Sequence, residues 1–323
     1  LFPFSDADQT DPETGLTGGI LSRLTAQGSV PKIMYTYTPS EYWGGHGSLV
    51  HTDLTATRDM DVPDDVRIYV YAGSQHALGA FPLTEGDPSD GVRAQNPINC
   101  LDHRAFMRAA LTALDRWVTT GEAPPPSRHP RIDDGTAVTP AKAAETLRTI
   151  PGVNPPAPFR RFTRLDFGPD PGVPTQIPAG IGREYPHLVS AVDRDGNETG
   201  GLRLPFITVP LATHTGWNTR HADMGGEGQT LSTGGASGGT LKGSTIPFPA
   251  TREERQATGD PRLAVEERYD SREHYQDLVK RAAQDLVDQR YLLAEDLEPM
   301  VNLAGRHYDL LKSQVREAQP AGD

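Results

Sequence analysis

A glutamate and a histidine, two residue types used in proton transfer, follow the first two strands that the sequence predicts. Residues 33–38 form a β-branched and aromatic run that ends just before Glu41, and residues 66–71 form a second run that leads into His76. Parallel strands end at one edge of a sheet, so we expect both side chains at the same edge. A carboxylate that orients an imidazole, beside a serine hydroxyl, makes a hydrolytic site. This spacing makes His76 the candidate general base and Glu41 its candidate orienting acid.

Each assignment has an alternative in the sequence. On the residues alone, an ordinary histidine at a strand end is the better interpretation of His76. Glu41 could instead be an interfacial carboxylate beside Trp43. Asp53 and Asp59 lie between the same two strands and compete with Glu41 as the acid.

The composition excludes several classes of protein. The 323 residues suit one large domain, or one domain with a long accessory region. Apolar residues at 36% and charged residues at 23% are typical of a globular chain. A net charge of -12 argues against a nucleic-acid partner, and the single cysteine, Cys100, excludes an internal disulfide and a cysteine-based zinc site. No apolar run approaches the roughly 20 residues that span a bilayer, so we expect no membrane span, and the compartment stays open.

Apolar periodicity predicts a helix over residues 106–117 that ends at Gly121 and packs behind the two strands. Two strands with a helix behind them are typical of the closing edge of an α/β sheet. We therefore expect residues 1–121 to form an α/β core.

Residues 122–260 are rich in proline and glycine and hold only short apolar runs, so we expect long loops that wrap the core. Helical stripes return at residues 275–287, with a capping arrangement at Asp270, and at residues 303–315. These patterns predict an accessory region over residues 122–323 that packs on the core and ends in a helical hairpin.

Several sequence blocks resemble the alpha/beta hydrolase domain family of bacterial proteins. The blocks around the candidate acid and histidine are Pro31-Lys32, Glu41-Tyr42-Trp43, Ser48-Leu49-Val50-His51-Thr52-Asp53, Val66-Arg67-Ile68-Tyr69 and Ala72-Gly73-Ser74-Gln75-His76. Later blocks are Asn96-Pro97-Ile98-Asn99, Arg116-Trp117-Val118, Val192-Asp193-Arg194-Asp195-Gly196-Asn197-Glu198, Pro210-Leu211-Ala212-Thr213, Gly216-Trp217-Asn218, Gly259-Asp260-Pro261-Arg262 and Glu266-Glu267-Arg268-Tyr269. The resemblance thus covers nearly the whole chain and supports the catalytic interpretation of His76.

The resemblance implies the C-terminal half of an α/β-hydrolase, with the last strands of a mostly parallel sheet. In such enzymes the nucleophile serine precedes the acid and the histidine. No serine before Glu41 has the Gly-x-Ser-x-Gly context of a nucleophile; these serines are Ser5, Ser22, Ser29 and Ser40. We expect the nucleophile in a preceding half of the same polypeptide, in keeping with a chain that begins at Leu1 instead of methionine.

A Gly-x-Ser-x-Gly pattern does occur later, at Gly235-Ala236-Ser237-Gly238-Gly239. It follows the histidine, in a glycine-rich tract with no predicted strand before it and no predicted helix after it. The motif needs that context to expose a nucleophile, so a linker is the better interpretation.

The resemblance implies that the complete protein hydrolyses an ester or related acyl bond of a small-molecule substrate, through a covalent acyl-enzyme, without a cofactor or a metal. This chain alone is expected to be inactive. The alternative from another class is a non-catalytic binding or scaffold protein on a hydrolase-derived fold, with the loop at Trp217 and the helical hairpin as contact surfaces.

Three further features have competing interpretations. Residues 193–198 resemble a calcium loop, but position 204 is Leu204 where a bidentate glutamate is needed, which favours a tight acidic turn at Gly196. Trp217 could line a pocket or pack a loop. His51 is interpreted as packed or solvent-facing and not as catalytic.

Overall fold

Helices and strands are interspersed along the chain, which is of mixed α/β class. The computed structural model describes residues 2–87, 91–155, 162–170, 173–226, 228–230 and 242–317, with the backbone alone at residues 87, 92 and 313–317. The helices are α1 (Ser22–Ala26), α2 (Pro39–Gly45), α3 (Arg104–Thr120), α4 (Pro140–Leu147), α5 (Pro205–Thr208), α6 (Arg252–Thr258), α7 (Val265–Arg268), α8 (Arg272–Asp288) and α9 (Leu297–Glu317), with short 3-10 turns η1 (Gly47–Val50), η2 (Ala222–Met224) and η3 (Ala294–Asp296). Within these ranges, no helix combines the length and the apolarity needed to cross a bilayer.

The strands are short and pair two by two. They are β1 (Gln9–Thr10), β2 (Thr17–Gly18), β3 (Ile33–Tyr37), β4 (Val66–Val70), β5 (Gly86–Asp87), β6 (Val92–Arg93), β7 (Ala137–Val138), β8 (Thr163–Asp166), β9 (Gly180–Glu184), β10 (Val189–Ser190), β11 (Ala212–Thr215) and β12 (Ser244–Pro247). Among the described residues, β3 and β4 pair in parallel, and the other pairs are antiparallel. The larger parallel sheet expected from the sequence stays a prediction.

β3 and β4 correspond to the two apolar runs of the sequence, and each ends one residue earlier than predicted. β3 stops at Tyr37 because Thr38 is the N-cap of α2, and β4 stops at Val70. Their register runs from Ile33 opposite Val66 to Tyr37 opposite Val70. The carboxyl ends of both strands therefore lie at one edge, as expected of parallel neighbours.

β4 lies inside a small parallel array, and β3 lies at its edge. On the side away from β3, isolated parallel bridges join Tyr69 of β4 to Arg128, and Tyr71, which follows β4, to Leu202. The alternate backbone groups of β3, at Met34 and Thr36, point away from β4. No backbone hydrogen bond joins that edge to any described residue.

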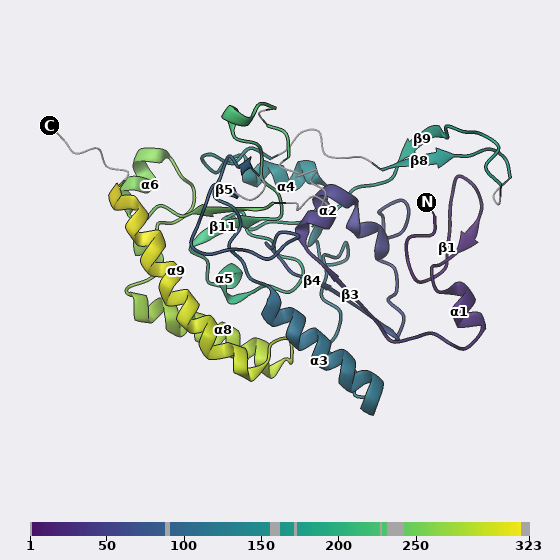
Figure 1. Cartoon of the computed structure of the whole chain (residues 1–323), viewed down its shortest axis with the longest axis horizontal. Coiled ribbons are helices and arrows are strands. Elements are labelled where there is room, and N and C mark those ends of the chain that lie inside the picture. Colours follow the sequence, from purple (N-terminus) through teal and green to yellow (C-terminus); the bar gives the residue numbers. More distant parts are fainter. Residues whose placement is uncertain are drawn as a thin grey trace.

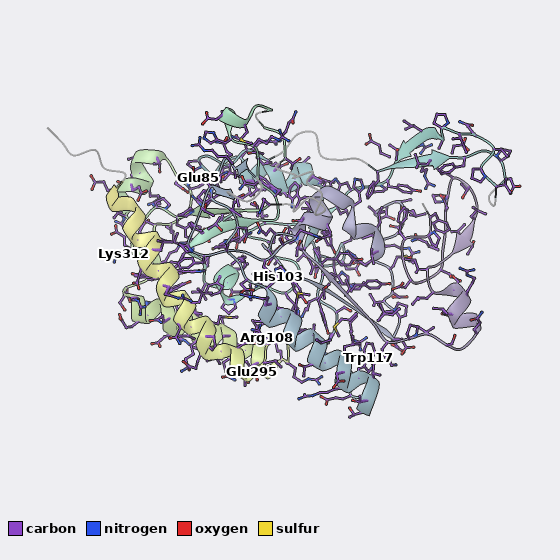
Figure 2. All side chains as sticks on the ribbon, viewed as in Figure 1. Glu85, His103, Arg108, Trp117, Glu295 and Lys312 are labelled. Atoms are coloured by element: carbon purple, nitrogen blue, oxygen red, sulfur yellow. The ribbon has the colours of Figure 1, made fainter. Side chains whose placement is uncertain are left out.

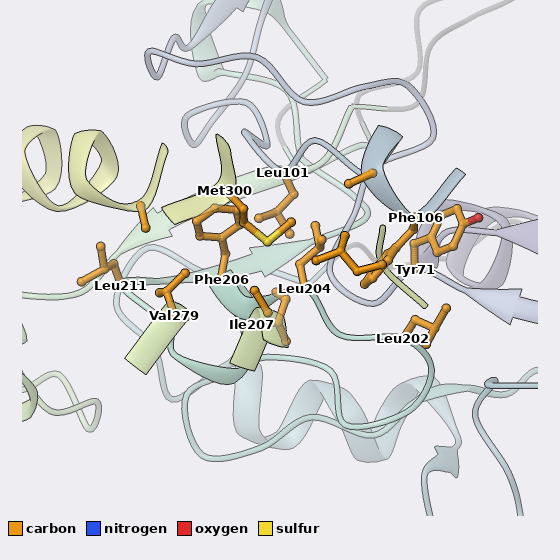
Figure 3. Close-up of a cluster of buried hydrophobic side chains, with 14 of the residues drawn as sticks. Tyr71, Leu101, Phe106, Leu202, Leu204, Phe206, Ile207, Leu211, Val279 and Met300 are labelled. Atoms are coloured by element: carbon orange, nitrogen blue, oxygen red, sulfur yellow. The ribbon is translucent and has the colours of Figure 1, made fainter. Parts of the chain in front are cut away.

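The largest hydrophobic cluster joins β4, α3, α5, α8 and α9 (Figure 3). Phe106 of α3 packs on Tyr71 just after β4, with ring centroids 5.4 Å apart. One of the short apolar runs of residues 122–260 forms the buried helix α5, which begins at a proline, and it contributes Phe206 and Ile207 to the cluster. Residues from both 1–121 and 122–323 share this cluster, and the domain boundary between them stays a prediction.

The two C-terminal helices predicted from apolar stripes are present as α8 and α9, which lie side by side along one flank of the molecule (Figure 1). The predicted cap at Asp270 is wrong by one residue, because the hydroxyl of Ser271 accepts a hydrogen bond from the His274 backbone N–H. α9 begins at Leu297, before Pro299, since proline is tolerated in the first turn of a helix.

Phe106→Ala tests the packing of α3 on the β4 layer. The ring is 1% exposed, so its removal leaves a cavity, and we expect a loss of about 3–5 kcal/mol in the free energy of unfolding measured with urea. Met107→Ala is the matched control on the same helix, because that side chain is 44% exposed. Its loss should be within about 0.5 kcal/mol. Equal losses for the two variants would mean that α3 is not packed as described.

Candidate functional site

The end of β3 places Glu41 through a capped helix. Thr38 leaves the strand as the N-cap of α2, with Pro39 in the first helical position. Oε2 of Glu41 accepts hydrogen bonds from the Thr38 backbone N–H at 2.6 Å and from the Thr38 hydroxyl at 2.7 Å, a capping box. One carboxylate oxygen is thus fixed by the helix end, and the other, Oε1, is left to face the end of β4.

The end of β4 places His76 through a turn that needs a glycine. Gly73 has φ +69°, and a Cβ there would lie 2.5 Å from Cδ1 of Ile207. The backbone N–H of His76 donates to Oγ of Ser40 at 3.0 Å, and that hydroxyl donates to the Gly216 carbonyl at 2.6 Å. The histidine loop is therefore tied to α2 by its own backbone.

The structure brings the two predicted site residues into contact. Nδ1 of His76 is hydrogen-bonded to Oε1 of Glu41. An ionised carboxylate only accepts, so Nδ1 carries the proton in this pair and Nε2 of a neutral ring is left as an acceptor. The His76 side chain is 55% exposed and that of Glu41 26%, so the imidazole faces outward. This arrangement can take a proton from a group presented to Nε2.

Neither competing acid reaches His76 by a hydrogen bond. The Asp53 carboxylate accepts hydrogen bonds within its own turn, from Thr57 and Arg58 N–H groups and nearby hydroxyls. Asp59 accepts from the backbone N–H groups of residues 132 and 133. Of the three candidate carboxylates, Glu41 is the one that contacts the imidazole.

His51 is buried, which selects the packed alternative of the two that the sequence left open. Its Nε2 lies 2.7 Å from the Tyr42 hydroxyl, and its ring lies 4.2 Å from that of His129. Burial holds the pKa of His51 well below its usual range. These contacts place the His51 imidazole in the packed interior.

His103 is a neighbour of the pair that the sequence analysis missed. It lies at the start of α3 (Figure 2), stacked on Tyr71 with ring centroids 5.4 Å apart. Its protonation is coupled electrostatically to Glu41 and His76. Burial lowers the pKa of His103, against the opposing effect of Asp102. A neutral ring at this position places no positive charge beside the site.

The sequence analysis also missed that Glu198 and Ser40 contact the segments that carry the candidate site. Glu198 is fully buried, and its Oε2 accepts a hydrogen bond from the Gly73 backbone N–H at 3.0 Å. The Trp43 side chain also donates to this carboxylate. Burial raises the pKa of Glu198 to about 7. Glu198 ends one of the blocks that carry the family resemblance, but nothing in that block indicated Gly73 or Trp43 as its partners.

No described serine presents its hydroxyl to Nε2 of His76 in a hydrogen bond. Ser40 lies closest in the chain to Glu41, but its hydroxyl is buried between the Gly216 carbonyl and the His76 backbone. The Gly-x-Ser-x-Gly pattern around Ser237 lies outside the described residues.

The acidic segment at residues 193–198 is a tight turn, as the sequence favoured. Gly196 has φ +77°, and Oδ1 of Asp193 accepts the backbone N–H groups of Asp195 and Asn197. Trp217 is 4% exposed and packs edge-on against Trp43, in a buried hydrophobic cluster that includes residues of α2 and α4. In the described part of the chain, no group of three or more His, Cys, Asp or Glu side chains is placed to hold a metal ion.

The chain matches a protein-family model. Residues 3–302 match the family model described as an alpha/beta hydrolase domain. No curated protein and no solved structure matches the chain. The matched range includes both Glu41 and His76 and ends within α9.

Proposed function

Because the chain belongs to the alpha/beta hydrolase domain family, we propose that Glu41 and His76 are the acid and the base of a serine-hydrolase site that cleaves an ester or related acyl bond. The hydrogen bond from Nδ1 of His76 to the Glu41 carboxylate carries the proposal. It fixes the tautomer in which Nε2 accepts a proton, as general-base catalysis requires.

In the proposed reaction, a serine hydroxyl attacks the acyl carbon and its proton moves to Nε2 of His76. Glu41 stabilises the imidazolium through Nδ1–H. The imidazolium then returns its proton to the leaving alkoxide as the carbon–oxygen bond breaks, which leaves an acyl-enzyme. A water molecule, deprotonated in the same way by Nε2, hydrolyses the acyl-enzyme and regenerates the serine.

We place the nucleophile outside the described residues. Two observations favour this: the imidazole of His76 is open to solvent, and the backbone edge of β3 has no partner among the described residues. A further parallel strand paired with β3 would bring a strand-to-helix turn to the edge that holds Glu41 and His76. On this proposal, residues 1–121 are the C-terminal part of the catalytic core and residues 122–323 are an accessory region.

Burst kinetics test the proposed function. The complete gene product that includes this chain should release p-nitrophenol from p-nitrophenyl butyrate in a burst equal to its own concentration, because the serine is acylated faster than it is freed. This chain alone should give no burst. A burst from this chain alone would assign the nucleophile to these residues, with Ser237 as the candidate. No turnover of any ester by the complete gene product would favour a non-catalytic binding protein.

A further inference from the structure

A buried carboxylate lies beneath the two segments that carry the candidate acid and base. Glu198 ends the turn at residues 193–198 and is 4% exposed. Burial of an ionised carboxylate is costly unless donors compensate for the lost water. Both donors recorded for Glu198 belong to the segments of the candidate site, the Gly73 N–H and the Trp43 side chain.

The first donor fixes the turn that leads to His76. Gly73 begins this turn with a positive φ, and its N–H binds Oε2 of Glu198 at 3.0 Å. Its carbonyl accepts Nδ2 of Asn99 at 2.6 Å, and the same amide reaches the Thr215 carbonyl at 2.9 Å. The N–H and the carbonyl of Gly73 are therefore both held by buried side chains.

The second donor fixes the helix that carries Glu41. Trp43 lies on α2, is 4% exposed, and packs against Trp217 with ring centroids 5.8 Å apart. Its hydrogen bond to Glu198 ties α2 to the same carboxylate that holds Gly73. The Glu198 carboxylate thus holds both segments, in addition to the contact between Ser40 and the His76 backbone.

We propose that Glu198 is a positioning residue that keeps the Glu41 carboxylate and the His76 imidazole in register, and this inference rests on the proposed hydrolase function. Glu198 does not touch the reacting atoms. It acts through α2 and the Gly73 turn, so its loss should let the Glu41–His76 hydrogen bond lengthen or break. A misplacement of about 1 Å in a catalytic group costs about 100-fold in rate.

Three variants test the proposal in the complete gene product. Glu198→Ala removes the acceptor. Glu198→Gln keeps one of the two oxygen acceptors and should restore most of the function. Asp195→Asn is the matched control, because Asp195 lies on the same turn but pairs with Arg268, away from the site.

The first readout is the tautomer of His76, from the nitrogen-15 chemical shifts of its ring. In the wild type, the neutral ring should carry its proton on Nδ1, as the Glu41 contact requires. Glu198→Ala should shift the population towards the Nε2–H tautomer, while Glu198→Gln and Asp195→Asn should not. A change confined to folding would not alter the tautomer in molecules that remain folded.

The second readout is ester hydrolysis. Glu198→Ala should lower kcat by about 10- to 100-fold with little change in KM, and Glu198→Gln should restore most of the loss. If Glu198→Ala does not fold, Trp43→Phe is the substitute, because it removes one donor to Glu198 and keeps an aromatic ring. It should give a smaller tautomer shift and a smaller fall in kcat. A folded Glu198→Ala, or Trp43→Phe in its place, with the wild-type tautomer overturns the proposal. If no ester is hydrolysed by the wild type, the proposed function fails, and the tautomer alone decides the role of Glu198.

Discussion

His76→Ala is expected to lower kcat for ester hydrolysis by the complete gene product by about 10⁴-fold or more, with a much smaller change in KM. The imidazole has no described substitute, because His103 is buried and stacked on Tyr71 and no hydrogen bond joins it to Glu41. The His76 ring is half-exposed and contributes little to the packed interior, so the variant should fold normally. Steady-state hydrolysis of p-nitrophenyl butyrate measures the effect.

His274→Ala is the matched control for this variant. His274 lies on α8, is partly exposed, and interacts with Asp270 instead of the candidate site. Its hydrolysis rate should equal that of the wild type. A His76→Ala variant that keeps more than about a tenth of the wild-type kcat would remove His76 from the mechanism.

Glu41→Gln is expected to lower kcat by about 10²- to 10⁴-fold. The amide oxygen can still accept from Thr38, so the capping box of α2 should persist. The amide NH₂ would face Nδ1 as a donor and favour the Nε2–H tautomer, in which Nε2 cannot accept the serine proton. The measurement is the same kinetic assay, with the unfolding free energy followed in urea.

Glu254→Gln is the matched control, since Glu254 holds the equivalent position of α6 and accepts the Ala250 backbone N–H at 2.8 Å. Both variants should show similar small changes in stability, and only Glu41→Gln should lose activity. Equal activity in the two variants would mean that Glu41 only caps α2 and takes no part in catalysis.

The pairing of Glu41 with His76 could be predicted because it depends on local signals. Each residue follows a short β-branched run, and parallel strands bring their carboxyl ends together. The capping box was also readable, because Thr38 and Glu41 have the spacing of that motif. The sequence could not separate this structural role from a catalytic one, because one carboxylate serves both contacts.

The supports of the site could not be predicted, because their partners are distant in the chain. The hydrogen bond between Glu198 and Gly73 spans 125 residues, and that between Ser40 and Gly216 spans 176. No periodicity or local motif specifies contacts of that kind, which depend on how β4, α2 and the turn at residues 193–198 pack. His103 was missed for the same reason, since α3 brings it near the pair only in the folded chain.

Labelling of the complete gene product by a fluorophosphonate probe, with the labelled peptide mapped by mass spectrometry, tests the central claim most directly. The account predicts covalent labelling of one serine outside the described residues, at a rate that falls at least about 100-fold in His76→Ala. No labelling of the folded wild-type protein, or labelling at the same rate in His76→Ala, would contradict the claim that Glu41 and His76 activate a serine.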